Sequence, residues 1–137
     1  MKKPLSAVNI FAVILGLFLV IEGFWGMFSP VVFGIFTTNL LHATIHLLLG
    51  VTGIYLGTRN KARNFSLYVG LLLLVVGILH LVPVVDKLII QLLNVNNAVA
   101  FLNIIVGIIA ILLALLTPKR AVAATPTLHH ANKKHHR

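Results

Sequence analysis

Four apolar stretches constrain the fold of this chain more than any other feature. They cover residues 8–28, 38–57, 65–85 and 98–117. As helices rising about 1.5 Å per residue, all four are long enough to cross the roughly 30 Å hydrocarbon core of a bilayer. Hydrophobic residues make up 59% of the chain and charged residues only 9%, which is typical of a membrane protein. The sequence therefore predicts an all-α fold, a four-helix transmembrane bundle within a membrane domain at 1–118.

The segments between these stretches predict how the spans are connected. The loop at 58–64 is so short that the second and third spans must be antiparallel neighbours, which favours an up-down-up-down bundle. Apolar residues at 86–94 recur at the spacing of a short amphipathic helix, which we expect to lie on the membrane surface between spans three and four. The segment 31–36 is too short to cross and is expected to lie in the interface. Residues 119–137 are expected to form a basic, disordered tail.

Positive charge is concentrated on one side of the predicted bundle. The N-terminus, the 58–64 loop and the C-terminal tail hold ten of the eleven Lys and Arg residues, and the opposite loops hold only Lys87. The positive-inside rule then predicts that both termini are cytoplasmic. The net charge of +9 flanks apolar spans, so the expected partners are the bilayer and anionic lipid head groups, with no specific nucleic acid.

Polar residues inside the spans all fall at a similar depth. Counted from the outer end of each span, their depths are about 6 to 12 Å, and they comprise Glu22, His42, His46, His80 and Asn103. His42 and His46 are one helical turn apart on one face of the second span, with Asn39 a turn above them. Because ionisable residues in a membrane mark functional sites, we expect these side chains to converge in the outer half of the bundle.

Such a cluster is compatible with several functions. A structural polar network that includes Asn39 and Asn103 would fix which helices face one another, as in a structural or accessory subunit of a homo-oligomer or larger complex. A metal site would use His42, His46, His80 and Glu22 as ligands for a transition metal such as zinc, copper or iron. Haem b would instead need His80 opposite His42 or His46. Finally, the cluster could belong to an oligomeric transporter of protons or small solutes.

Enzymatic chemistry has the least support in the sequence. The chain has no cysteine, which excludes disulfides and thiolate sites. It also lacks paired carboxylates, a phosphate-binding loop and a nucleophile elbow. The tail histidines lie among lysines and are expected to belong to a solvated basic tail rather than to a metal-collecting one; they are His129, His130, His135 and His136.

Three patterns of glycine and polar residues resemble those of a known family. They are Leu15-Gly16 through Glu22-Gly23-Phe24, Asn39-Leu40-Leu41-His42 with His46 and Gly50 to Gly53, and Val69-Gly70 through Gly77 and His80. This combination over residues 8–116 resembles an uncharacterised family of small four-span bacterial membrane proteins with an Asn-x-x-His entrance to the second span. The resemblance implies a bacterial inner membrane and assigns no catalytic residue.

Overall fold

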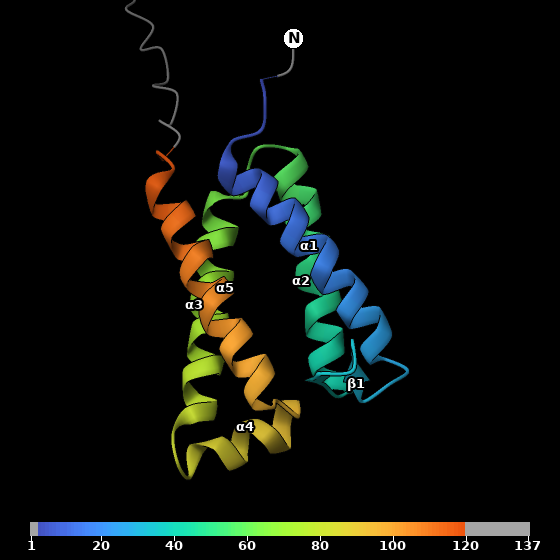
Figure 1. Cartoon of the computed structure of the whole chain (residues 1–137). Coiled ribbons are helices and arrows are strands. Elements are labelled where there is room, and N and C mark those ends of the chain that lie inside the picture. Colours follow the sequence, from blue (N-terminus) through green and yellow to red (C-terminus); the bar gives the residue numbers. More distant parts are fainter. Residues whose placement is uncertain (1–2, 120–137) are drawn as a thin grey trace, which may run out of the picture.

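The computed structural model describes residues 3–119 of the chain. Four long helices are each long and apolar enough to cross a membrane, and they are α1 (Ala7–Gly26), α2 (Leu40–Thr58), α3 (Arg63–Leu81) and α5 (Asn97–Leu116). A short helix, α4 (Val85–Leu93), lies across one end of the bundle (Figure 1). The predicted all-α fold with four membrane-spanning helices is confirmed, and so is the short helix before the last span. Apart from Lys119, the predicted tail at 119–137, with its histidines, lies outside the described residues.

The helix ends differ from the predicted ones where local chemistry interrupts an apolar run. Helix α1 ends at Gly26, and α3 ends at Leu81 instead of continuing to Val85. Pro83 explains the second difference, because proline has no N–H to donate and disfavours helical geometry in the residue before it. The predicted interfacial segment forms a small antiparallel hairpin of β1 (Val31–Val32) and β2 (Phe36–Thr37).

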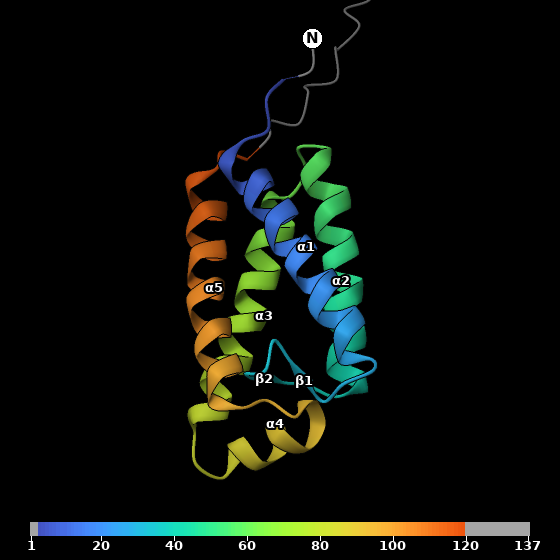
Figure 2. The same cartoon turned by 45° about the vertical axis from the view of Figure 1, so that its right-hand side comes forward.

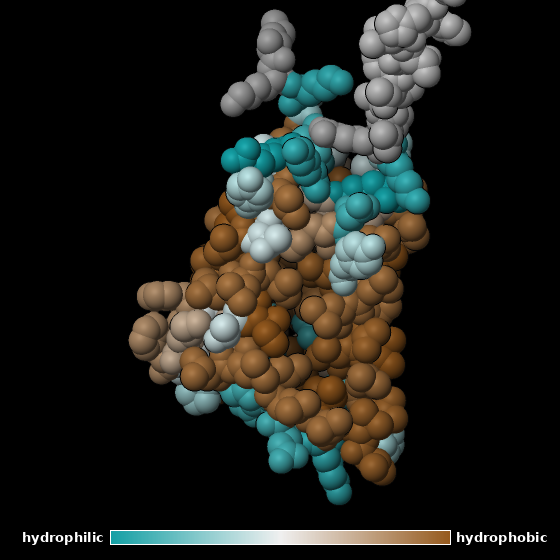
Figure 3. Space-filling model, turned by 180° about the vertical axis from the view of Figure 1, so that it is seen from behind, coloured by the Kyte–Doolittle hydropathy of each residue, from teal (hydrophilic) through white to brown (hydrophobic). Residues whose placement is uncertain are grey.

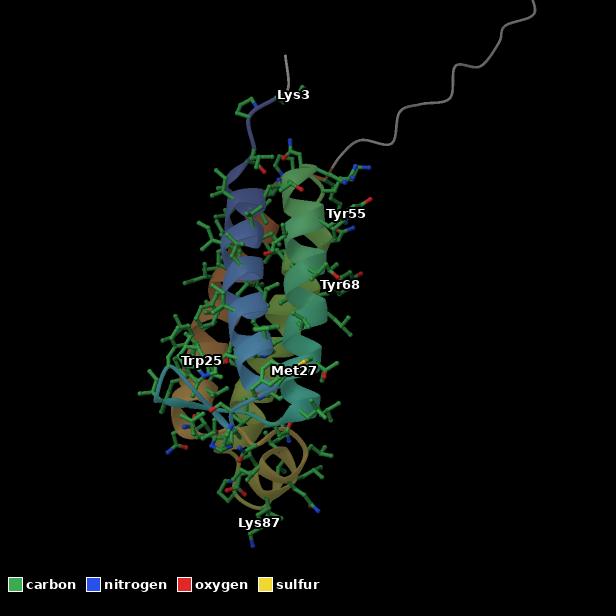
Figure 4. The ribbon with its side chains drawn as sticks, turned by 90° about the vertical axis from the view of Figure 1, so that its right-hand side faces the viewer. Lys3, Trp25, Met27, Tyr55, Tyr68 and Lys87 are labelled. Atoms are coloured by element: carbon green, nitrogen blue, oxygen red, sulfur yellow. The ribbon has the colours of Figure 1, made fainter. Side chains whose placement is uncertain are left out.

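The two ends of the bundle are chemically different. The start of α1, the loop before α3 and the end of α5 lie at one end, which we call the terminal end; the hairpin and α4 lie at the opposite, capped end (Figures 1 and 2). Between the hydrophilic ends runs a broad apolar band (Figure 3). Tyr55 and Tyr68 lie towards the terminal end and Trp25 towards the capped end (Figure 4). This arrangement is that of a membrane helix bundle with aromatic residues near its interfaces.

Close glycine contacts hold the helices together in two pairs, α1 with α2 and α3 with α5. A Cβ atom built on Gly16 would lie 2.6 Å from the backbone oxygen of Gly50, and one built on Gly50 would lie 2.7 Å from the oxygen of Gly16. Gly70 and Gly107 show the same reciprocal contact, at 2.8 and 2.7 Å. No other residue fits these positions without movement of the backbone. Membrane helices pack in this way because lipid provides no hydrophobic drive between them.

The two helix pairs are internal repeats. Every buried residue of α2 has a buried counterpart in α5, 57 positions later: His42 with Val99, Ala43 with Ala100, His46 with Asn103, Gly50 with Gly107, Gly53 with Ala110, and Gly57 with Ala114. Six of the nine buried residues of α1 have a buried counterpart in α3 at a shift of 54 positions, including Gly16 with Gly70 and Gly23 with Gly77. The chain is thus two equivalent helical hairpins, joined side by side and connected differently at the capped end.

The repeat predicts that the two central glycine contacts contribute similarly to stability. We expect Gly50→Val and Gly107→Val each to lower stability by about 1–3 kcal/mol, because the added side chain forces two backbones apart. Thermal unfolding in detergent, followed by the fluorescence of Trp25, measures the effect. The control is Leu112→Val, since Leu112 is 53% exposed on the outer surface of α5. Unfolding temperatures of both glycine variants equal to that of the control would contradict this packing.

Candidate functional site

A chain of hydrogen bonds joins three buried ionisable side chains from α1 and α2. The Oε2 atom of Glu22 lies 3.1 Å from Nδ1 of His46, and Nε2 of His46 lies 2.9 Å from Nε2 of His42. All three residues are at most 4% exposed. The helical spacing of four places both imidazoles on the face of α2 that packs against α1. The predicted convergence of these three residues is therefore present in the structure.

The chain of hydrogen bonds continues to the capped end. Nδ1 of His42 lies 2.9 Å from the backbone oxygen of Leu93, the last residue of α4. Asn39 has two roles next to this contact: its Oδ1 accepts from the backbone N–H of His42 at 2.9 Å, and its Nδ2 donates to the oxygen of Leu92 at 2.8 Å. Asn39 thus caps α2 and holds the end of α4 above the two histidines.

Further polar side chains connect the two segments that close the capped end. Nδ2 of Asn94 donates to the oxygen of Thr38, and Nδ2 of Asn96 donates to the oxygen of Ile35, both at 2.8 Å. The hydroxyl of Thr37 donates to the backbone oxygen of Asn94. Sequence reasoning missed these contacts, because each joins a side chain to a backbone group more than 50 positions away. They make the hairpin and the end of α4 one connected cap.

A small hollow lies beside the two histidines. Its volume is about 60 Å³, and its lining includes His42, His46 and Asn103 together with apolar side chains from α2, α3 and α4. In the view from behind, a hollow opens in the apolar face and hydrophilic atoms are visible at its base (Figure 3). Asn103 is 5% exposed and comes from the fourth span, as the depth argument predicted. It occupies in α5 the position that His46 occupies in α2.

His80 makes a different contact. Its Nε2 lies 3.0 Å from Oδ1 of Asn97 at the start of α5, and its Nδ1 is buried without a partner among the described residues. The hydrogen-bond chain does not include it. Within residues 3–119, no group of three or more His, Asp or Glu side chains is arranged to hold a metal ion.

The hydrogen bonds restrict where the protons of the cluster can lie. A backbone oxygen can only accept, so Nδ1 of His42 carries the proton in its bond to Leu93. If His42 is neutral, its Nε2 is bare and must accept from Nε2–H of His46. The bond between Glu22 and His46 then needs one more proton, on the carboxyl oxygen or on Nδ1 of the imidazole. In both cases the pair is neutral overall and shares one proton.

Comparison with known proteins identifies a family. The family model described as a domain of unknown function (DUF4383) matches residues 9–116, which include almost all of the four long helices and the entire cluster. No curated protein and no solved structure matches the chain significantly. The resemblance to an uncharacterised family is confirmed.

The proton shared by Glu22 and His46 allows us to predict how substitutions of Glu22 change stability. Glu22→Gln is expected to stay close to the unmodified protein in stability, because the amide N–H can donate to Nδ1 of His46. Glu22→Leu should cost about 1 kcal/mol or more, since it leaves a buried ring nitrogen without a donor. Thermal unfolding of both variants in detergent measures the difference. Ile21→Leu serves as the control, because it changes the neighbour of Glu22 that is 52% exposed on the outer surface of α1. Equal stability of the Gln and Leu variants would show that the hydrogen bond to His46 contributes nothing.

Proposed function

Because the chain belongs to the DUF4383 family, for which no activity is assigned, we propose its function from the geometry of the buried cluster. We propose that it is a multi-pass protein of the bacterial inner membrane that serves as a structural or accessory subunit. The observation that carries this proposal is the continuous chain from Glu22 through His46 and His42 to the oxygen of Leu93. It links α1, α2 and the end of α4, and it uses all four ring nitrogens of the two histidines.

Such a chain suits a structural role because it determines orientation. Hydrogen bonds between membrane helices contribute only about 0.6 kcal/mol on average, so their main effect is to select which faces meet. Here the selected arrangement also holds the cap, since Asn39 and His42 both bind backbone oxygens at the end of α4. A rigid cap of defined shape is what a partner subunit, or a second copy of the chain, would recognise.

A second candidate function, binding of a transition-metal ion, rests on a specific feature of the same cluster. Both imidazoles direct Nδ1 at an acceptor, Glu22 for His46 and the oxygen of Leu93 for His42. Metal-binding histidines are typically held this way, by a carboxylate or a backbone oxygen on the nitrogen that faces away from the metal. Their Nε2 atoms converge beside the hollow, where Asn103 would supply an oxygen. In this proposal the ligands are His42, His46 and Asn103, and Glu22 supports His46.

This metal proposal differs from the set predicted from the sequence, because His80 is bonded to Asn97. Haem b has less support than a single metal ion. A hollow of about 60 Å³ is far too small for a porphyrin, and the two converging histidines belong to one helix. Transport has no comparable support, because the buried polar residues nearer the terminal end, Asn9 and Ser66, form hydrogen bonds between chain segments.

The proposed orientation places the terminal end in the cytoplasm. Of the six Lys and Arg residues that the structure describes, five lie at the terminal end and only Lys87 lies at the capped end (Figure 1); the five are Lys3, Arg59, Lys61, Arg63 and Lys119. The cluster and its cap then face the periplasmic half of the membrane. A partner that recognises the cap would contact it from the periplasmic side or from within the outer leaflet.

The structural and metal proposals make opposite predictions for His46→Gln. A structural role predicts that elemental analysis of the purified protein finds no stoichiometric zinc, copper or iron. It also predicts that the His46→Gln protein still assembles, because the amide of Gln can replace part of the hydrogen bonding. A metal role predicts about one ion per chain, lost in His46→Gln and retained in His80→Gln, the matched control. Stoichiometric metal that disappears only with His46 would overturn the structural proposal.

Orientation can be tested by cysteine labelling, since the native chain has no cysteine. A single cysteine at position 61 should be protected from a membrane-impermeant thiol reagent added to intact cells. A single cysteine at position 87 should react, because it lies on the exposed surface of the cap. The reverse pattern would contradict cytoplasmic termini.

A further inference from the structure

A large groove at the terminal end lies apart from the buried cluster. Its volume is about 900 Å³, and it is lined by the start of α1, the loop before α3, the first turns of α3 and the end of α5. Its walls therefore come from both helical hairpins. None of the residues assigned to the cluster or the cap lines it.

The groove is cationic, and no acidic side chain lines it among residues 3–119. Lys61, Arg63 and Lys119 line it. The whole sequence contains only two acidic residues, Glu22 and Asp86. Glu22 is bonded to His46, and Asp86 belongs to α4 at the capped end. Among the described residues, three cations thus line a space that contains no acidic side chain, and an external anion is the complementary ligand.

Backbone donors add to this positive character. Helices α1 and α3 both begin at the groove, and neither has a side-chain cap at its N-cap residue, Ser6 or Ala62. At the capped end, by contrast, α2 and α5 are capped by Asn39 and Asn96. Free N–H groups and the helix dipole favour anions at a helix N-terminus. The carbonyl ends of α2 and α5 lie at the same end of the bundle (Figure 1). The oxygens of Leu56 and Gly57 accept from N–H groups of the following loop, and the oxygen of Thr117 accepts from Arg63.

Hydrogen bonds between chain segments hold the groove in shape. Nε of Arg63 donates to the oxygen of Thr117 at 2.7 Å, which fixes the guanidinium group between α3 and the end of α5. Asn9, only 3% exposed, donates to Oδ1 of Asn60 at 2.6 Å and accepts from the N–H of Ala62 at 2.8 Å. The loop that carries Lys61 is therefore fixed to α1. A preformed site loses less conformational entropy when it binds a ligand.

One wall of the groove is apolar and continues onto the outer surface of the bundle. It consists of Leu67, Tyr68 and Leu115, and the last two are 68% and 61% exposed. Tyr68 lies deeper along the bundle than Tyr55, towards the apolar band (Figure 4). A soluble anion would make no apolar contact with this wall, whereas an acyl chain would pack along it. We propose that this groove binds the phosphate of one anionic phospholipid, with an acyl chain against Tyr68 and Leu115.

The proposal is tested by titrating the full-length protein in detergent with phosphatidylglycerol and, separately, with phosphatidylcholine that has the same acyl chains. Native mass spectrometry counts the lipid molecules bound to each protein. The unmodified protein should retain one phosphatidylglycerol in preference to phosphatidylcholine. Lys61→Gln combined with Lys119→Gln should weaken phosphatidylglycerol binding on the order of 10-fold. Each Lys or Arg near a membrane surface strengthens the binding of an anionic head group by roughly a few-fold, and this double variant removes two of them. Lys61→Arg combined with Lys119→Arg should bind phosphatidylglycerol as tightly as the unmodified protein.

The matched control is Arg59→Gln combined with Lys87→Gln, which removes the same charge from residues outside the groove. Arg59 lies only two positions from Lys61, and its guanidinium group stacks on Tyr55 at 4.3 Å. We expect this control to leave the affinity unchanged. An equal loss in both double variants would show diffuse attraction and overturn the site. Complete displacement of the lipid by inorganic phosphate at the same concentration would show a site for soluble phosphate and overturn the lipid assignment. These residues are independent of the cluster, so the proposal fails or holds separately from the proposed function.

Discussion

The close approach of α1 to α2 at their glycine residues is the contact on which the buried cluster depends. A Cβ atom on Gly23 would lie 2.7 Å from the backbone oxygen of Ala43, so only glycine permits the two helices to come this near. Glu22 precedes this contact on α1, and His42 and His46 flank Ala43 on α2. The carboxyl group reaches Nδ1 of His46 because the backbones are close, not because the side chains are long. The buried cluster is therefore a consequence of packing between small residues.

Internal repetition shows which parts of the chain serve packing and which serve the cluster. Positions that bring helices together are equivalent in both hairpins, as with Gly50 and Gly107. Positions of the cluster are not: His42 corresponds to Val99, and Glu22 corresponds to Val76. Ionisable residues in an apolar helix are unfavourable, so the valines are what packing alone requires. The hydrogen-bonded cluster thus belongs to one hairpin, whereas the packing positions are shared by both.

Much of this could be predicted from the sequence, and the limits have physical causes. Hydropathy and length predict the four spans, because the thickness of a bilayer is a strong constraint. Depth along each span predicts that Glu22, His42, His46 and Asn103 lie at one level. It does not predict that His80 turns towards Asn97, since helix rotation and side-chain rotamers decide which residues at one level touch. The repeat was detectable as Asn39, His46 and Gly50 followed by Asn96, Asn103 and Gly107 at a constant shift.

The proton count explains how an acid and two histidines tolerate burial between apolar helices. A carboxylate alone would be a buried unpaired charge, whereas with His42 neutral, Glu22 and His46 together with one proton form a neutral, hydrogen-bonded pair. The second hydrogen bond, between the two Nε2 atoms, is the one link whose proton a metal ion would displace. The supports on the other sides, Glu22 and the oxygen of Leu93, would remain as they are. The structural and metal-binding proposals therefore share one scaffold. They differ in whether a hydrogen bond or a metal ion, with Asn103 as a further ligand, joins the two Nε2 atoms.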